Sequence, residues 1–89
     1  MTTSHYIALD LGGTQIRAAR FSEDQELEER AAVPTRAEQG FESVFSRVVE
    51  TIREVWPEDD QVAAVGLGAP GPLNFKRGVL RFAPNLPGW

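Results

Sequence analysis

The chain has 89 residues, enough for one small domain with a thin hydrophobic core, and 42% hydrophobic and 25% charged residues are typical of a globular protein. The net charge of −4 without a basic cluster argues against a nucleic acid or an anionic membrane as partner, and the lack of cysteine excludes disulfides and thiolate metal sites. No apolar run approaches the roughly 20 residues that span a bilayer, and no basic signal-peptide region begins the chain, so we expect a cytoplasmic protein.

The first feature of the chain is a strand, a tight turn and a second strand. Residues His5–Leu11 form an almost continuous apolar run, which predicts a strand buried on both faces. Gly12-Gly13-Thr14 follows as the turn, and residues 15–21 predict a second strand antiparallel to the first.

This turn is suited to binding an anion. Gly12 and Gly13 have no side chain, so their backbone can adopt positive φ and approach a ligand closely. Successive N–H groups in such a turn can converge on phosphate oxygens, and Thr14 adds a hydroxyl donor. Asp10 could hold Mg²⁺ directly or through water, because magnesium usually combines one or two carboxylates with waters and substrate phosphates. A purely structural hairpin, with Asp10 accepting backbone N–H bonds, explains the same residues.

A third strand is predicted over residues 26–33. Its polar composition suits the edge of a sheet, with Leu27 and Val33 as the inward residues. Pro34 ends this strand, and Thr35 begins a capping box, Thr-Arg-Ala-Glu, in which it would be the N-cap of a helix.

The clearest local signal is the helix that follows. Apolar residues recur at spacings of three and four until Pro57 ends the pattern. They are Phe41, Val44, Phe45, Val48, Val49, Ile52, Val55 and Trp56. Such a stripe predicts a helix packed on the sheet rather than a groove for a partner.

Residues 62–67 predict a short apolar fourth strand. Residues 26–67 therefore form a strand–helix–strand unit, for which a right-handed crossover is expected. We interpret the acidic turn between helix and strand, Glu58-Asp59-Asp60, as solvated rather than as a metal site.

The segment from Gly66 to Gly71 matches the dinucleotide-binding pattern G-x-G-x-x-G literally. That fingerprint requires a helix to open at the glycines, and the prolines at 70 and 72 oppose one. We interpret the segment as a strand running into a rigid Gly/Pro loop, which suits a polyhydroxylated ligand but is also ordinary in a structural turn. Beyond it, residues 73–78 predict a turn, residues 79–82 a short fifth strand and residues 83–89 an irregular tail.

Four stretches together resemble the N-terminal part of the ROK family of repressors, open reading frames and sugar kinases, which includes bacterial glucokinases. They are residues 7–17, 66–73, 78–80 and the tail Ala-Pro-Asn-Leu-Pro-Gly-Trp at 83–89. The first stretch is shared with the wider sugar-kinase, actin and Hsp70 superfamily, and the tail makes the resemblance specific. It covers nearly the whole chain, from Tyr6 to Trp89.

The resemblance implies an ATP-dependent hexose kinase of α/β class and ribonuclease-H-like fold. Residues 1–89 would form part of its N-terminal, phosphate-binding lobe: a mixed sheet in the order β-β-β-α-β, then a short strand. In such a kinase Asp10 would face the magnesium of MgATP. The residues around the phosphates would be Gly12, Gly13, Thr14 and Gln15, with Arg17 supporting the loop.

The resemblance also places Gly71, Pro72 and Asn85 along the sugar site. Family members are several times longer, and their catalytic base (an aspartate in an Asn-Asp pair), His/Cys zinc motif and adenine pocket lie beyond the tail seen here. We therefore expect no catalytic residue in this chain, no activity from it alone, and ATP and Mg²⁺ as cofactors of the full-length protein. Apolar surface left by the missing lobe would favour a homo-oligomer.

Three functions remain open at this point. The first is the lobe of a glucokinase-like hexose kinase, with a hexose and a nucleotide as partners. The second is a ROK-type sugar-sensing or transcriptional-regulator domain without catalysis, and the third is a small α/β domain with a purely structural turn. Family repressors carry a helix-turn-helix before the first strand, whereas the few residues before Tyr6 contain no Lys or Arg, which favours the kinase. Neither the sugar nor the choice between ATP and polyphosphate follows from the sequence.

Overall fold

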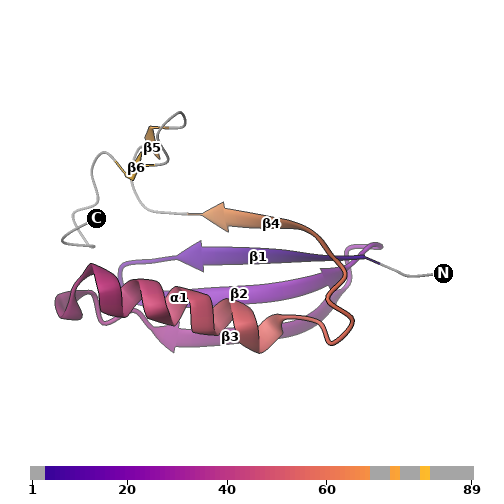
Figure 1. The fold of residues 1–89 in the computed structure, drawn as a ribbon, viewed down its shortest axis with the longest axis horizontal. Helices are drawn as coiled ribbons and strands as arrows, with labels where there is room; N and C mark the ends of the chain where they lie inside the picture. The colour runs from indigo at the N-terminus through magenta and orange to yellow at the C-terminus, as the bar shows by residue number, and fades with distance from the viewer. Residues whose placement is uncertain (1–3, 69–72, 75–78, 81–89) are drawn as a thin grey trace.

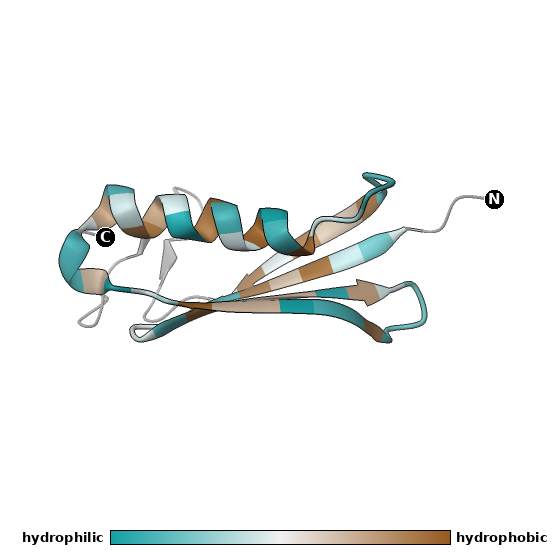
Figure 2. Cartoon of the chain, turned by 90° about the horizontal axis from the view of Figure 1, so that it is seen from below, coloured by the Kyte–Doolittle hydropathy of each residue, from teal (hydrophilic) through white to brown (hydrophobic). Residues whose placement is uncertain are grey.

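The computed structural model describes residues 4–68 and the two short segments 73–74 and 79–80. A four-stranded sheet carries one α-helix on one face (Figures 1 and 2). The elements are β1 (His5–Leu11), β2 (Gln15–Ser22), β3 (Leu27–Pro34), the 3-10 turn η1 (Ala37–Gln39), α1 (Phe41–Val55) and β4 (Val62–Gly68).

The strand order in the sheet is β3-β2-β1-β4. β2 is antiparallel to both β1 and β3, whereas β4 is parallel to β1. β3 and β4 therefore run in the same direction at opposite edges of the sheet, and α1 connects them across it (Figure 1). The predicted mixed sheet and its strand–helix–strand unit are confirmed.

The hydrophobic core lies between α1 and one face of the sheet. Successive side chains of a strand point to opposite faces, so Ile7, Leu9 and Leu11 of β1 are buried while Tyr6, Ala8 and Asp10 are exposed. The prediction that β1 is buried on both faces is wrong for the described residues. α1 covers only one face, and Figure 2 shows the other face of the sheet without a covering element from the described chain.

β3 occupies the predicted edge position, but only one of its two predicted inward residues points inward. Val33 packs against the core, whereas Leu27 is 52% exposed. The register between β2 and β3 shifts after Arg20, so that Leu27 pairs with Phe21 instead of continuing the alternation. The prediction for Leu27 is wrong because this irregularity carries it to the uncovered face.

The helix begins later than the capping box suggests. α1 starts at Phe41 with Gly40 as its N-cap, and no side chain caps it. Arg36 and Gly40 have positive φ values of 52° and 90°, and they turn the chain through η1 before the helix starts. Thr35 is therefore not the N-cap, although the predicted helix end before Pro57 is confirmed.

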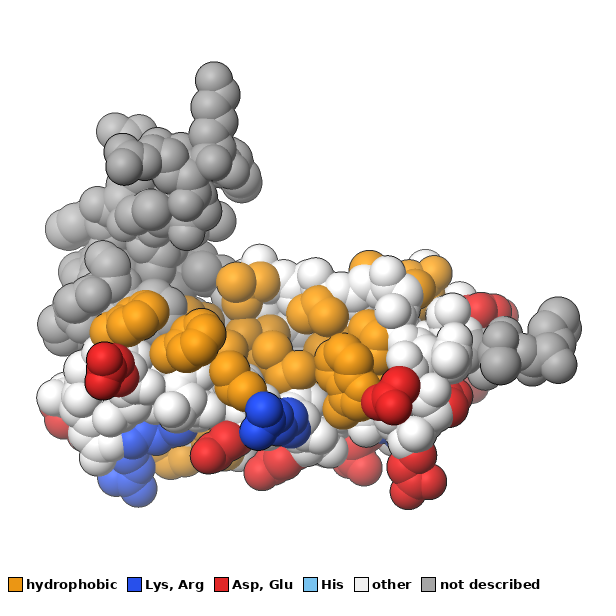
Figure 3. All heavy atoms as spheres, in the orientation of Figure 1, with side chains coloured by type: hydrophobic (Ala, Val, Ile, Leu, Met, Phe, Trp, Pro, Cys, Tyr) orange, Lys and Arg blue, Asp and Glu red, His pale blue; other side chains and the backbone are white. Residues whose placement is uncertain are grey.

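α1 packs on β1, β2 and β3, whereas within the described chain its backbone does not come close to β4, of which only Val62 packs against the core. Large apolar side chains consequently stay exposed along the flank of α1 and on the helix-facing side of β4 (Figure 3). We call this surface the α1–β4 strip; its residues are Phe41, Phe45, Trp56, Val65 and Leu67. The apolar stripe of the helix thus extends beyond what this sheet buries.

β4 confirms the fourth predicted strand and contains both Gly66 and Gly68. Because the first glycine of a dinucleotide fingerprint must lie in the turn after the strand, this placement agrees with rejecting that motif. The predicted turn over residues 73–78 is wrong at its start, since β5 (Leu73–Asn74) pairs antiparallel with β6 (Val79–Leu80). None of the described helices is long and apolar enough to cross a membrane.

Candidate functional site

The turn between β1 and β2 lies at the end of the sheet where β1 terminates. Its two arms are closed by a hydrogen bond from the Gly12 N–H to the Gln15 carbonyl, at 2.9 Å. Asp10 and Arg17 are paired across the two strands just before the turn. The fold therefore brings all six residues predicted to bind the phosphates and the metal into one hairpin tip: Asp10, Gly12, Gly13, Thr14, Gln15 and Arg17.

Gly12 is required by close contact within the hairpin. A Cβ atom at this position would lie 2.9 Å from the Gln15 carbonyl oxygen. Among the described glycines, only Gly40 has positive φ. Gly12 therefore does not use the positive φ that glycine allows, and its lack of a side chain instead permits the close approach of one strand to the other.

Asp10 presents its carboxylate on the uncovered face of the sheet. The side chain is exposed and makes no hydrogen bond or ion pair with any described residue. Gly68 is its partner on β4, and a Cβ there would lie 3.7 Å from Asp10 Oδ1, so the absence of a side chain leaves room beside the carboxylate. The carboxylate is thus available to a cation.

Arg17 is engaged with its neighbour rather than with Asp10. Its Nε and a terminal nitrogen donate to Gln15 Oε1 at 3.1 and 3.0 Å. This contact occupies the side-chain oxygen of Gln15, so that the side-chain nitrogen Nε2 remains a donor at the hairpin tip.

A hollow of about 720 Å³ extends from this tip along the uncovered face of β1, β2 and β3. Its floor is mostly apolar and built from small side chains, with Ala8, Ala19 and Ala32 among them. Asp10 and Arg17 supply charges at the end near the turn. Asp10 at this end is the lining carboxylate that could hold a metal ion, and Arg30 adds a second positive charge farther along the hollow.

The residues present fit one mode of magnesium binding. Within residues 4–68, no group of three or more His, Cys, Asp or Glu side chains is placed to hold a metal ion. A cation at Asp10 would therefore depend on water and phosphate for its other ligands, which is the arrangement that Mg²⁺ prefers with nucleotides. The predicted sugar-site residues Gly71, Pro72 and Asn85 lie outside the described residues.

Sequence reasoning missed the contact that supports the turn from behind. Thr35 is fully buried, and its hydroxyl donates to the Gly12 carbonyl at 2.8 Å. The Thr35 N–H donates to the Thr14 carbonyl at 2.9 Å. In the sequence, a threonine after a strand-ending proline is the only sign of this contact, and the capping-box pattern explains the same threonine as a helix cap.

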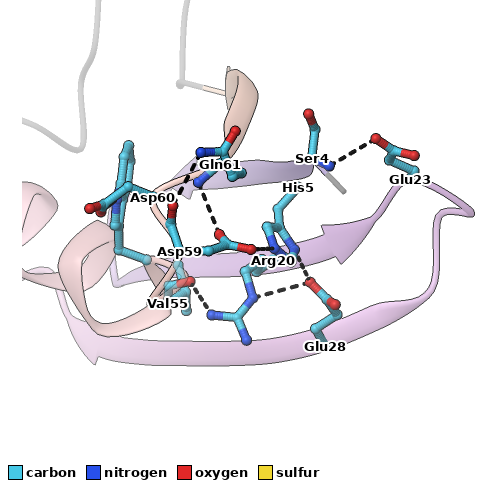
Figure 4. A network of polar contacts seen from close by, with 10 residues as sticks. Ser4, His5, Arg20, Glu23, Glu28, Val55, Asp59, Asp60 and Gln61 are labelled. Carbon is cyan, nitrogen blue, oxygen red and sulfur yellow. Dashed lines mark hydrogen bonds and ion pairs between the residues drawn. The ribbon is translucent and has the colours of Figure 1, made fainter. Parts of the chain in front are cut away.

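A second polar cluster lies at the opposite end of β1 and joins three parts of the chain (Figure 4). The ring of His5 lies between Glu28 of β3, at 2.6 Å, and Asp59 of the α1–β4 connection, at 3.2 Å. Arg20 pairs with Glu28 at 3.2 Å and donates to the Val55 carbonyl at 2.8 Å, at the end of α1. The acidic turn is exposed, as predicted, and Asp59 in addition connects it to β1.

This cluster makes the stability of the fold dependent on pH. The hydrogen bonds with Glu28 and then Asp59 raise the pKa of His5 above its usual 6.5. Since the folded-state pKa is the higher one, the stabilisation is complete below the unfolded-state value and is lost as the pH rises through the folded-state pKa. The hydrogen bond from the Gln61 N–H and then that from His5 lower the pKa of Asp59, so its contribution is lost in acid.

We expect the His5→Gln variant to lose most stability near pH 6 and little above about pH 8, because only protonated His5 attracts both carboxylates. Urea unfolding of the 89-residue chain and the variant across this range measures the difference. His5 is the single histidine, so its ring signals can also be titrated directly by NMR. A difference between the two proteins that does not change with pH would contradict the expectation.

Comparison with known proteins decides the family. The model of the ROK family matches residues 6–89. The chain belongs to the ROK family. It is 39% identical over 83 residues to a glucokinase of Thermotoga maritima, covering 93% of this chain and 26% of the relative.

Two solved structures share the fold. A ROK hexokinase from Thermus thermophilus is 41% identical, with a TM-score of 0.77, and the match covers 94% of this chain and 27% of the other. A ROK family glucokinase from Streptomyces griseus, in complex with glucose and AMPPNP, is 29% identical, with a TM-score of 0.78. This match covers 98% of this chain and 26% of the other. This ROK chain thus spans about a quarter of the length of these relatives. The expected fold, that of actin, Hsp70 and the sugar kinases, is confirmed.

Proposed function

We propose that residues 1–89 are part of the N-terminal lobe of an ATP-dependent hexose kinase, and that they form its phosphate-binding turn. The observation that carries the proposal is the match of nearly the whole chain to a ROK glucokinase structure that holds glucose and AMPPNP. The hairpin tip supports it, because Gly13 and Thr14 follow closely after Asp10 in one turn and the Asp10 side chain is exposed and bonds to no described residue. ATP as donor also supports a cytoplasmic location.

In this reaction the sugar 6-hydroxyl oxygen forms a bond to the γ-phosphorus, and the β,γ-bridging oxygen leaves with ADP. Phosphoryl transfer is mostly positioning and charge stabilisation. The turn N–H groups and Thr14 would hold phosphate oxygens, and Gln15, oriented by Arg17, would add a donor. Mg²⁺ at Asp10 would neutralise charge on the phosphates. The base that takes the hydroxyl proton is expected outside this chain, so the chain alone should be inactive.

A coupled assay of the full-length protein tests the proposal. MgATP is offered with glucose, mannose, fructose, N-acetylglucosamine and N-acetylmannosamine, and polyphosphate replaces ATP in a parallel series. Turnover with a hexose supports the kinase and identifies the sugar. Sugar binding without any turnover would instead support a sensing or regulatory domain.

The α1–β4 strip leads to an expectation about assembly. We propose that the rest of the kinase covers this strip, and that the 89-residue chain by itself buries it against a second copy. Exposed apolar surface favours association, so light scattering at micromolar concentrations should show a dimer or larger species.

The Phe45→Asp variant should shift that chain toward monomer, because it places a charge within the strip, where Phe45 is 50% exposed. Ser46→Asp adds the same charge at the next, exposed helix position and should leave the association unchanged. A monomeric wild-type chain, or equal effects of both substitutions, would contradict the expectation.

A further inference from the structure

Thr35 holds the phosphate-binding turn by both of its hydrogen-bond donors. It follows β3 and is 0% exposed, whereas the turn lies 23 residues earlier in the sequence. The hydroxyl reaches the carbonyl of Gly12, before the tip, and the N–H reaches the carbonyl of Thr14, after it. One buried residue therefore fixes two carbonyl groups of the turn.

Fixing these carbonyls also fixes the adjacent N–H groups. The described chain contains no cis peptide bond, and in a trans peptide the carbonyl of one residue and the N–H of the next point in opposite directions. With the Gly12 carbonyl directed at the Thr35 hydroxyl, the Gly13 N–H points away from it. In the same way, the Gln15 N–H points away from the backbone N–H of Thr35. The two hydrogen bonds of Thr35 thus fix the orientation of the Gly13 and Gln15 N–H groups, which are candidate donors to a phosphate.

The helix supports this arrangement through a single side chain. Arg47 of α1 donates to the Thr35 carbonyl at 2.8 Å and also bonds Gln39 of η1. All three backbone and side-chain polar groups of Thr35 are therefore engaged: the hydroxyl and N–H with the turn, and the carbonyl with Arg47. Through these contacts Thr35 links the turn to η1 and α1.

We propose that Thr35 is a positioning residue for nucleotide binding, which orients the N–H groups of the phosphate-binding turn and is itself held by Arg47. This inference rests on the proposed kinase function, since it assigns the turn to the phosphates of the nucleotide. It predicts that loss of the Thr35 hydroxyl weakens the binding of MgATP and does not change the binding of the sugar.

The Thr35→Val variant removes the hydroxyl at nearly constant volume, and Thr35→Ser keeps the hydroxyl while removing a methyl group. In the full-length protein we expect Thr35→Val to raise KM for MgATP about tenfold, with KM for the sugar changed less than about twofold. Thr35→Ser should restore KM for MgATP to within about threefold of wild type.

A matched control is available in α1. Thr51 is also buried, at 1% exposure, and its hydroxyl donates to the Arg47 carbonyl at 2.6 Å within the helix. Thr51→Val loses a buried hydroxyl of the same kind away from the turn, so it should lower thermal stability without changing KM for MgATP. Equal effects of Thr35→Val and Thr51→Val on KM for MgATP would overturn the proposal and leave only a structural role.

The two proposals fail in different ways. If the wild-type protein phosphorylates a sugar and Thr35→Val has an unchanged KM for MgATP, the role of Thr35 is refuted and the kinase stands. If no sugar is phosphorylated, the kinase proposal fails, and calorimetric titration with MgATP then tests Thr35: about tenfold weaker binding to Thr35→Val supports its role. An unchanged affinity, or no binding to the wild-type protein, overturns it.

Discussion

For the proposed kinase, Asp10→Asn in the full-length protein is expected to lower kcat by about 100-fold or more, with KM for the sugar within about twofold of wild type. Asn has the shape of Asp but lacks the charge that would hold Mg²⁺ on the phosphates. Steady-state kinetics over a magnesium titration should therefore also show that the variant needs more Mg²⁺ for half-maximal activity.

The position of Asp10 separates this effect from loss of folding. Its side chain is exposed and bonds to no residue of the described chain, so replacing it with Asn removes no contact that the described fold uses. A structural hairpin in which Asp10 accepts backbone N–H bonds predicts the opposite, a loss of stability at unchanged activity. Asp24→Asn, in the exposed turn between β2 and β3, removes the same charge far from the hairpin tip and should leave kcat unchanged. A kcat of Asp10→Asn within about threefold of wild type would exclude Asp10 as the metal ligand.

The parts of this fold that depend only on residues close together in the sequence could be predicted from it. β1 was predicted with its observed ends, because an apolar run stops at two glycines. The end of α1 at Val55 follows from a 3.6-residue periodicity that Pro57 interrupts. The grouping of Asp10, Gly12 and Arg17 also follows locally, since a hairpin brings both of its arms to one tip.

The missed features all depend on contacts between distant parts of the chain. Thr35 has the sequence context of a helix cap, but a turn 23 residues away competes successfully for its hydroxyl. His5 binds carboxylates 23 and 54 residues away, and nothing near it in the sequence indicates either. The register shift that exposes Leu27 is likewise a property of two paired strands. Local patterns therefore group the candidate site residues in one hairpin, but they do not indicate the residues that support it.

Gly12→Ala is expected to damage both the fold and nucleotide binding. The added Cβ would lie 2.9 Å from the Gln15 carbonyl oxygen, which is backbone and cannot move without opening the hairpin. That same oxygen accepts the bond from the Gly12 N–H that closes the turn, and the Gly12 carbonyl accepts from Thr35. We expect the free energy of unfolding of the 89-residue chain to fall by about 1–3 kcal/mol, and KM of the full-length protein for MgATP in the proposed reaction to rise more than about tenfold.

Gly66→Ala provides the matched comparison, because a Cβ at that position of β4 meets nothing within 4 Å. It makes the same chemical change in a strand without crowding the backbone, so the free energy of unfolding should stay within about 0.5 kcal/mol of wild type. Urea unfolding of both variants measures the difference in their free energy of unfolding. Steady-state kinetics of the same variants in the full-length protein measure the change in KM for MgATP. If Gly12→Ala were as stable as Gly66→Ala and bound MgATP normally, the close approach of the two arms would not be what requires glycine at this position. The turn would then accept a side chain, and its fit to phosphate would have to come from Gly13 and Thr14 alone.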